Sequence, residues 1–328
     1  MTSSAPVFVT GGNGFVGSRL VHALVAAGRS VRCLLRETSD VSRLGGVAYE
    51  RVAGDVRDLD SLRKGMEGCV GVFHLASLSS WTDIESPQMI DVGVGGTRNV
   101  LEAAKAAGKL RTVFMSSAVA VNGSKTPEVF NERSQNTLPL DRFTYVRAKV
   151  QAEQLCKRAC DDGVPVVIVN PTEVYGANDT GFVTAGNLLD FHKSDPVLVC
   201  SGGTSVVHVD DVAAGTLAAF DKGRVGERYI LGGDNLSVIE LARVSLEILG
   251  EQKKRVLTVP NRLLRVAAKT AQALHLPFPI NPSVVPYATL YWFMDNAKAR
   301  DELGLTFRSP REALVPAFAW LRSAGHLR

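Results

Sequence analysis

A glycine-rich turn near the start of the chain constrains the fold more than any other feature of the sequence. The turn has the sequence TGGNGFVG and joins a β-branched run, Val7–Thr10, to a helical pattern, Phe15–Ala27. Glycine is needed where a chain turns tightly and where a diphosphate approaches bare backbone, and the following helix N-terminus offers free N–H groups. A strand before the motif and a helix after it are the context that makes it specific. The segment therefore predicts a dinucleotide-binding βαβ unit.

Short apolar runs and helical patterns alternate through the first half of the chain. Further strands are predicted at Ser30–Leu35, Val47–Ala53, Val72–Leu75, Arg111–Ser116 and Pro165–Asn170. Further helices are predicted at Leu59–Met66, Gln88–Ala107 and Thr144–Ala159. Nearly continuous apolar runs are typical of strands covered on both faces, and their alternation with helices gives a parallel sheet with right-handed crossovers. We predict an α/β fold with a Rossmann-type doubly wound parallel sheet.

The alternation breaks after Pro171, where glycine, asparagine and threonine become frequent. The remaining third of the chain is more helical, with predicted helices at Ser237–Leu249 and Arg311–Leu321. We therefore predict a dinucleotide-binding domain over residues 1–175, to which residues 204–232 return. Residues 176–203 and 233–328 are predicted to form a smaller, mostly helical, substrate-binding domain.

Composition excludes several classes of protein. The 328 residues are 45% hydrophobic and 21% charged, which is too apolar for a disordered chain. The formal net charge of +4 comes from scattered basic residues, which argues against nucleic-acid binding. No apolar stretch is long enough for a transmembrane segment, and the start lacks a signal-peptide pattern. The five cysteines contain no CxxC and the histidines lack ligand-spaced acids, so we expect a cytoplasmic protein without a metal site.

The end of the second predicted strand bears on the choice of cofactor. An acid there accepts hydrogen bonds from the adenosine ribose, whereas an arginine holds a 2′-phosphate. Leu35 is followed by Arg36 and then by Glu37. We interpret Arg36 as a 2′-phosphate ligand and expect NADPH, although Glu37 turned inward would favour NADH. Asp55, after the third strand, is placed either to contact adenine or to cap the next helix.

Tyr145 and Lys149 lie four residues apart at the start of a predicted helix, and so share one face. Ser117 lies just after a strand, at the sheet edge where such folds bind ligands. A phenol is a poor acid–base group at neutral pH, but a nearby ammonium and an oxidised nicotinamide lower its pKa. Tyr145 is then able to protonate a carbonyl oxygen that Ser117 holds, while hydride arrives at the carbon.

Several motifs together resemble the extended short-chain dehydrogenase/reductases. In chain order they are TGGNGFVG, His74-Leu75-Ala76-Ser77, Ser116-Ser117-Ala118, Tyr145-Val146-Arg147-Ala148-Lys149, Asn170-Pro171-Thr172, His208-Val209-Asp210-Asp211-Val212 and the segment 298–304. The resemblance covers essentially the whole chain. It is greatest to the dihydroflavonol-reductase-like branch, which includes 3β-hydroxysteroid dehydrogenases and bacterial proteins labelled hopanoid-associated sugar epimerases.

The resemblance implies a role for each matching residue. Ser117 would polarise the substrate oxygen, Tyr145 would be the acid–base group, and Lys149 would bind the nicotinamide ribose and lower the pKa of the tyrosine. The predicted cofactor contacts are Gly11, Gly14, Phe15, Val16, Gly17, Arg36, Asp55, Val56, Leu75, Ala76, Ser77, Lys149, Pro171 and Thr172. One position departs from the family, because Gly93 replaces an asparagine used in a helix kink and water relay. This departure puts the proton relay in doubt.

The substrate is left open by the sequence. Residues 274–294 are apolar and aromatic, including Phe278, Tyr287, Tyr291, Trp292 and Phe293, and form either a pocket wall or a domain core or dimer face. Trp81, Ser117, Tyr145 and Tyr175 are the candidate substrate contacts. The leading hypothesis is an NADPH-dependent reductase of a hydrophobic, polycyclic ketone, acting on a small molecule, with a homodimer possible. The alternatives are a sugar epimerase or 3β-hydroxy acid dehydrogenase/decarboxylase, and a catalytically weakened cofactor-binding regulator.

Overall fold

The computed structural model describes residues 5–78, 80–274 and 282–327. Its largest element is a seven-stranded sheet in the order β11-β7-β5-β4-β1-β2-β3, with every neighbouring pair parallel. The strands are β1 (Val7–Thr10), β2 (Val31–Leu35), β3 (Glu50–Ala53), β4 (Gly71–His74), β5 (Arg111–Met115), β7 (Val166–Pro171) and β11 (Arg228–Leu231). The strand order reverses between β1 and β4, which is where doubly wound sheets bind ligands.

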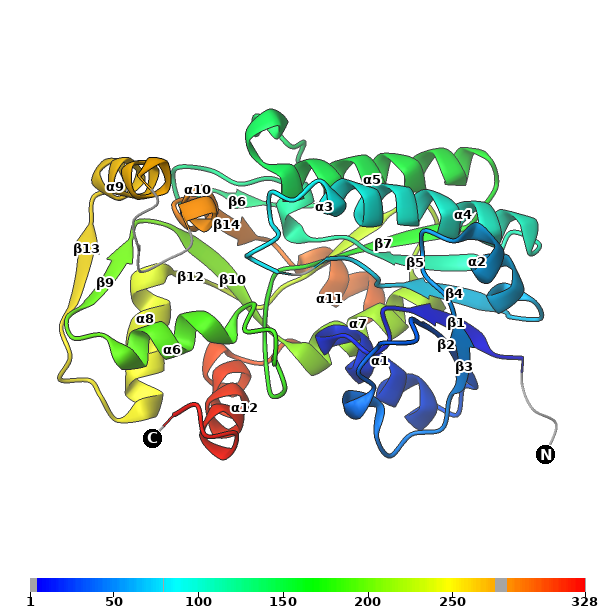
Figure 1. Ribbon diagram of the computed structural model, residues 1–328, viewed down its shortest axis with the longest axis horizontal. Coiled ribbons are helices and arrows are strands. Elements are labelled where there is room, and N and C mark those ends of the chain that lie inside the picture. Colours follow the sequence, from blue (N-terminus) through cyan, green and yellow to red (C-terminus); the bar gives the residue numbers. More distant parts are fainter. Residues whose placement is uncertain (1–4, 79, 275–281, 328) are drawn as a thin grey trace.

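Two layers of helices cover the sheet (Figure 1). One face packs against α1 (Phe15–Ala26), α7 (Val209–Lys222) and α11 (Ala297–Leu303). The other face packs against α2 (Leu59–Met66), α4 (Gly96–Ala106) and α5 (Thr144–Asp161). The apolar side chains of every central strand are buried on both faces, as their continuous apolar runs predict. The doubly wound α/β fold is thus confirmed.

A second unit lies beyond the carboxyl ends of these strands, at the left in Figure 1. It contains a mixed sheet built from β6 (Val129–Phe130), β8 (Glu173–Tyr175), β10 (Gly203–His208), β12 (Asp234–Ser237) and β14 (Tyr291–Met294). A separate parallel pair joins β9 (Val197–Cys200) to β13 (Val256–Val259). Its helices are α6 (Ala185–Lys193), α8 (Val238–Leu249), α9 (Asn261–Ala273), α10 (Val285–Ala288) and α12 (Pro310–Ser323). The ligand-binding edge of the large sheet therefore faces this second unit.

The chain crosses between the two units more often than the predicted domain limits suggest. Within residues 204–232, β11 joins the large sheet, whereas β10 belongs to the mixed sheet. Helix α11 lies within the predicted substrate-binding segment, yet its Ala299 and Leu303 are buried in the core of the large sheet. The mixed sheet also makes this unit less exclusively helical than predicted.

Most predicted elements begin and end within a few residues of the observed ones, because local signals set their limits. Asp58 caps α2, and capping boxes of Ser237 with Glu240 and Ser309 with Glu312 start α8 and α12. The predicted helix Gln88–Ala107 is observed as one continuous helical segment over residues 88–106, with a change of hydrogen-bond register inside it. It consists of α3 (Gln88–Ile90), a π-helical turn (Asp91–Gly95) and α4.

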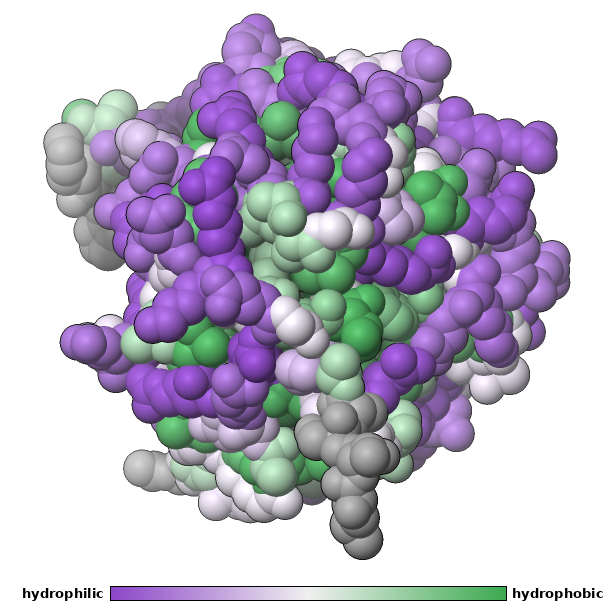
Figure 2. Space-filling view, turned by 90° about the vertical axis from the view of Figure 1, so that its right-hand side faces the viewer, coloured by the Kyte–Doolittle hydropathy of each residue, from purple (hydrophilic) through white to green (hydrophobic). Residues whose placement is uncertain are grey.

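The strands begin at the end of the molecule that Figure 2 shows. Hydrophilic residues cover most of this surface and surround a central strip of apolar residues. Across the described ranges, no helix combines the length and apolar character needed to cross a membrane. The same ranges contain no group of three or more histidine, cysteine, aspartate or glutamate side chains arranged to hold a metal ion.

Candidate active site

The glycine turn after β1 is shaped to admit a diphosphate. Gly11 has a φ of +73°, and a Cβ there would lie 2.7 Å from the backbone nitrogen of Ala76, so the turn touches the segment after β4. A Cβ at Gly17 would overlap the Gly11 carbonyl oxygen. Helix α1 begins after Gly14, with no side-chain cap and no acidic residue in its first turn. The N-terminal N–H groups are thus offered to an anion in a bare backbone cradle, which fits a dinucleotide cofactor.

The segments predicted to border the cofactor lie around this turn. Phe15 and Val16 are partly exposed in the first turn of α1, and Leu75, Ala76 and Ser77 are partly exposed after β4. Thr10 holds the two segments together, since its carbonyl accepts from Leu75 N at 3.1 Å and its hydroxyl from Ala76 N at 3.3 Å. Pro171 ends β7, and Thr172 N donates to Leu231 O at 3.1 Å. The structure therefore gathers residues from β1, β4 and β7 at one sheet edge.

A second group of predicted residues lies at the ends of β2 and β3. Arg36 and Glu37 are both exposed just after β2. Asp55 accepts from Arg57 at 2.9 Å through both of its oxygens, and these contacts, with a smaller contribution from Arg36, lower the pKa of Asp55. Capping of α2 by Asp55 is wrong, because Asp58 does this.

At this end of the site, the sequence predicted neither the contacts of Arg51 nor the burial of the Val56 side chain. Arg51 donates to the backbone carbonyls of Arg36 and Glu37, at 3.1 and 3.3 Å, and adds a cation beside Arg36. Val56 is buried in the core and packs against Gly96, where a Cβ would come within 2.7 Å of its side chain. The side chain of Val56 thus faces the core, which leaves only its backbone for the predicted cofactor contact.

Ser117, Tyr145 and Lys149 come together at the carboxyl end of β5. The side chain of Ser117 lies close enough to the Tyr145 hydroxyl to lower its pKa. Lys149, one turn further along α5, is only 6% exposed, with its Nζ 5.9 Å from the centre of the Tyr145 ring. The lysine ammonium donates to Met115 O at 3.1 Å, on the last residue of β5. The helical spacing and the strand end thus produce the predicted cluster of three side chains.

Burial dominates the proton equilibria of this cluster. It raises the pKa of Tyr145, although the neighbouring Ser117 side chain opposes this shift. Burial also lowers the pKa of Lys149 to about 8, although the nearby Glu153 opposes this shift. In the protein alone, Tyr145 is therefore held in its protonated form. The predicted lowering of its pKa by the ammonium and an oxidised nicotinamide applies to the cofactor complex and stays a prediction.

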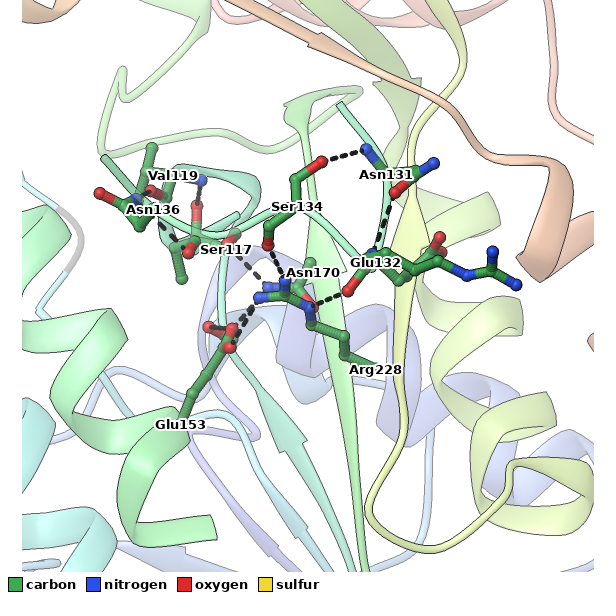
Figure 3. Close-up of polar contacts among 12 residues, drawn as sticks. Ser117, Val119, Asn131, Glu132, Ser134, Asn136, Glu153, Asn170 and Arg228 are labelled. Atoms are coloured by element: carbon green, nitrogen blue, oxygen red, sulfur yellow. Dashed lines mark hydrogen bonds and ion pairs between the residues drawn. The ribbon is translucent and has the colours of Figure 1, made fainter. Parts of the chain in front are cut away.

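A buried polar network links the backbone of Ser117 to helix α5 (Figure 3). Glu153, 4% exposed and one turn after Lys149 on α5, accepts from Ser116 Oγ at 2.6 Å and Asn170 Nδ2 at 2.7 Å. The same Asn170 amide donates to Ser117 O at 2.9 Å. Arg228, on β11, pairs with Glu153 at 3.3 Å. The network thus ties the backbone of Ser117 to the helix that carries Tyr145 and Lys149.

Arg228 also anchors the loop that follows β6. Its Nε donates to Glu132 O at 2.9 Å, and its guanidinium donates to Ser134 O as well. The Glu132 carboxylate accepts from Ile230 N at 2.9 Å, two residues after Arg228 on β11. Sequence reasoning missed this arginine and Glu153. The sequence offered one signal for Glu153, which is its position four residues after Lys149 and therefore on the same helix face.

The Gly93 position lies in the π-helical turn before α4, a type of turn frequent at functional sites. A Cβ there would make an ordinary contact, 3.7 Å from the Cβ of Ala148, beside Lys149. The Gly93 carbonyl accepts from Thr97 Oγ1 at 2.6 Å, and Thr97 in turn contacts His74 Nε2 at 3.0 Å. His74 is buried and its pKa is lowered to about 3 by burial, so it is a neutral core histidine.

Aromatic side chains lie beside Tyr145 on the side of the second unit. Trp81, Tyr287 and Trp292 belong to the same apolar cluster as Tyr145. The Tyr287 ring is 6.2 Å from Trp81 and 6.4 Å from Trp292. Tyr291 and Phe293 instead pair with each other on β14, and Phe278 lies outside the described residues. Part of the predicted aromatic segment therefore adjoins the catalytic cluster.

Tyr175 does not fit its predicted role as a substrate contact. Its side chain is completely buried in the core of the second unit, among residues of α6, α8 and α12. Its hydroxyl donates to Glu173 at 2.8 Å. The alternation of side chains along β8 directs Tyr175 into this core, and its packing is structural.

Comparisons with known proteins agree with this geometry. The model of the NAD dependent epimerase/dehydratase family matches residues 7–232. Sterol demethylase protein B of Methylococcus capsulatus is 34% identical, covering 97% of this chain and 98% of its own. A 4-hydroxy-2-methyl-3-oxo-4-farnesyl-3,4-dihydroquinoline-1-oxide ketoreductase of Stigmatella aurantiaca is 33% identical over 97% of this chain and 96% of its own.

A dihydroflavonol 4-reductase of Hordeum vulgare is 28% identical, covering 74% of each chain. The crystal structure of gox2253 superposes with a TM-score of 0.86 at 30% identity, covering 99% of this chain and 100% of that one. With the glycine cradle and the doubly wound sheet, these matches make this chain an NAD(P)-dependent oxidoreductase of the epimerase/dehydratase family of extended short-chain dehydrogenase/reductases, in its dihydroflavonol-reductase-like branch.

Proposed function

We propose that this protein is an NADPH-dependent reductase of a ketone on a hydrophobic, polycyclic small molecule, or the corresponding alcohol dehydrogenase in reverse. The observation that carries the proposal is the cluster of Ser117, Tyr145 and the buried Lys149, at the sheet edge that also holds the glycine turn. Such a group can hold and protonate one oxygen atom, which is what carbonyl reduction demands.

In the proposed reaction, the bound cofactor supplies a hydride to the carbonyl carbon. Ser117 Oγ and the Tyr145 hydroxyl donate hydrogen bonds to the carbonyl oxygen, so negative charge that develops there is stabilised. The C=O π bond becomes an O–H bond as the Tyr145 proton moves to this oxygen. The phenolate left on Tyr145 is stabilised by the Lys149 ammonium, and solvent returns the proton. The raised pKa keeps the proton on Tyr145 before cofactor and ketone bind.

The preference for NADPH over NADH rests on the cations beside β2. Arg36 is exposed, and the neighbouring Arg51 is tied to the backbone of residues 36 and 37. Two guanidinium groups near the expected adenosine ribose favour a 2′-phosphate, because arginine binds phosphate oxygens in a bidentate manner. Asp55 is engaged with Arg57, which limits its repulsion of that phosphate.

The substrate class rests on the aromatic wall beside Tyr145. Trp81, Tyr287 and Trp292 present apolar ring surface, and apolar walls with few polar groups are typical of sites for hydrophobic ligands. One relative is named as the ketoreductase of a farnesylated quinoline oxide, a bulky cyclic ketone. Both observations favour a polycyclic ketone over a sugar nucleotide. A homodimer and a cytoplasmic location stay predictions.

The direct test mixes purified protein with NADPH, and separately with NADH, and follows cofactor absorbance on addition of bulky cyclic ketones. We expect oxidation of NADPH that depends on the ketone and is faster than that of NADH. Cofactor that is bound but never oxidised by any ketone would refute the reductase. Interconversion of sugar nucleotides without net cofactor turnover would identify an epimerase instead, and oxidative loss of carbon dioxide from a 3β-hydroxy acid would identify the decarboxylase.

A further inference from the structure

Large apolar side chains are exposed mainly at one end of the molecule. Among the described residues, nine large hydrophobic side chains are strongly exposed, and five of them lie in β9, β13 and α9 or directly after α9. They are Leu198, Leu257, Leu263, Val266 and Leu274. These elements form the left-hand end in Figure 1, remote from the N-terminus. An exposed apolar surface of this kind marks an interaction site more often than scattered single residues do.

Helix α9 exposes large apolar side chains to solvent, whereas an ordinary amphipathic helix buries them. The side chains that it buries are the small ones of Ala268 and Ala271, whereas Leu263 and Val266 are 61% and 62% exposed. Leu263, Val266 and Leu274 follow spacings of three and eight residues, which places them on one face. A helix that forms only part of a monomer's core would direct its leucine and valine side chains inward.

The strand before α9 adds to the same surface. Leu198 on β9 and Leu257 on β13 are paired directly across the two strands, and both are exposed. Strand β13 leads into α9 through Pro260 alone. The paired leucines and the α9 face are thus connected by one residue of chain.

Charge distinguishes this surface further. Between residues 252 and 294 the sequence has six lysines and arginines and no aspartate or glutamate, whereas the whole chain has a net charge of only +4. The expectation of scattered basic residues therefore overlooks this segment. Four of these cations, Lys253, Arg255, Arg262 and Lys269, are exposed. Arg265 instead donates to Thr289 Oγ1, and Lys254 pairs with Glu251, so neither is fully available to a partner.

The acidic groups nearest to this surface do not cancel its charge. Glu251 precedes β13 and accepts from Lys254 at 2.9 Å and contacts His192 at 2.9 Å. Asp195, just before β9, is exposed. Along the sequence, the segments 195–200 and 252–274 thus carry one exposed acid, Asp195, and four exposed cations. Apolar side chains flanked by cations are the pattern of helices that lie in the interface of an anionic bilayer.

We propose that α9 and the β9–β13 pair dock this enzyme on the surface of an anionic lipid bilayer, with α9 lying in the plane of the interface. Leu263, Val266 and Leu274 would enter the acyl boundary, while Arg262 and Lys269 would contact headgroup phosphates. A second copy of the chain is a poorer occupant, because two like-charged surfaces would then face each other. The proposal does not depend on which ketone the active site reduces.

The experiment is co-sedimentation of the full-length protein with vesicles of phosphatidylcholine alone and of phosphatidylcholine mixed with phosphatidylglycerol. We expect binding to the anionic vesicles that weakens at high salt. The double substitution Leu263→Gln with Val266→Gln should weaken binding more than tenfold, since each side chain loses the gain from leaving water. Arg262→Gln and Lys269→Gln should each weaken binding about fivefold.

Val70→Gln is the matched control, because Val70 is 50% exposed before β4 of the large sheet, and it should not change vesicle binding. Circular dichroism and NADPH binding of each variant show that the fold is retained. Failure of the protein to bind either vesicle would overturn the proposal, as would equal binding to both. A dimer in analytical ultracentrifugation that Leu263→Gln with Val266→Gln disperses, without vesicle binding, would assign this surface to self-association instead.

Discussion

The two ends of the proposed cofactor site differ in how their charged side chains are held. At the end of β2, Arg36 and Glu37 are exposed, and water screens each of them. At the end of β5, Lys149 and Glu153 are almost completely buried, and Glu153 has three hydrogen-bonding or ionic partners. An exposed charged residue can be substituted at little cost to stability. A buried charge is stable only while all of its hydrogen-bonding and ionic partners are present. We therefore expect the first end to control selectivity and the second to control stability and chemistry together.

The largest effect on stability is expected from breaking the buried network. Glu153→Gln would leave Arg228 without its ionic partner, and loss of one member of a buried ion pair costs about 3 kcal/mol or more. Urea denaturation measures the change. Glu102→Gln is the control, because its pair with Arg63 is 2.8 Å long but half-exposed, and it should cost less than about 1 kcal/mol. Equal losses in the two variants would contradict the claim that burial makes the Glu153 network costly to break.

A smaller effect is expected from removing the exposed cation. Arg36→Ala should raise the KM for NADPH about tenfold, because one charge-assisted phosphate contact is lost at a solvated site. The KM for NADH should change little, and the free energy of unfolding should not change. Steady-state kinetics with both cofactors checks this, with Arg29→Ala, at the opposite end of β2 and paired with Asp221, as the control. NADH preference that survives the substitution would refute the 2′-phosphate assignment.

The pH dependence of ketone reduction tests whether the reaction needs the charged form of the buried Lys149. Below pH 8, Lys149 carries its charge and Tyr145 its proton, because the pKa of Lys149 is about 8 and that of Tyr145 is raised. Above pH 8 the ammonium is lost first, so kcat/KM should fall about fivefold between pH 8 and pH 9. A profile that is flat up to pH 10 would contradict the role given to the lysine.

The smallest effect is expected at Gly93, next to the catalytic helix. Gly93 has no positive φ, and a Cβ there has room. Gly93→Ala should therefore stabilise the protein by about 0.5 kcal/mol, because alanine lowers the conformational entropy of the unfolded chain. Gly96→Ala should instead destabilise by about 1 kcal/mol or more, since its Cβ would be 2.7 Å from Val56. Thermal unfolding compares the two. Destabilisation by Gly93→Ala as large as that by Gly96→Ala would show that the π-helical turn itself needs glycine.

The sequence was sufficient where the deciding interactions are local. The strand–glycine turn–helix motif placed β1 and α1 to within one residue, because the turn leaves no other path for the chain. The four-residue spacing of Tyr145 and Lys149 predicted their shared face for the same reason. The π-helical turn was not predicted, because the spacing of apolar residues along a helix does not reveal a local change in its hydrogen-bond register.

The sequence was insufficient where strand order brings distant residues together. Arg228 reaches Glu153 across 75 positions only because β11 is added beside β7 at the sheet edge. Arg51 reaches the backbone of Arg36 because β3 pairs with β2. The predicted substrate contact Tyr175 was wrong for a similar reason, because its core neighbours include residues of α8 and α12, far along the chain.

The central claim is that Tyr145 donates the proton in carbonyl reduction, and Tyr145→Phe tests it most directly. This substitution removes one oxygen and leaves the apolar cluster around the ring in place. We predict that ketone-dependent NADPH oxidation falls by about 10²–10⁴-fold. NADPH binding, followed by fluorescence, should stay within a few-fold of the unchanged protein. Retention of the full rate of NADPH oxidation by Tyr145→Phe would contradict the account.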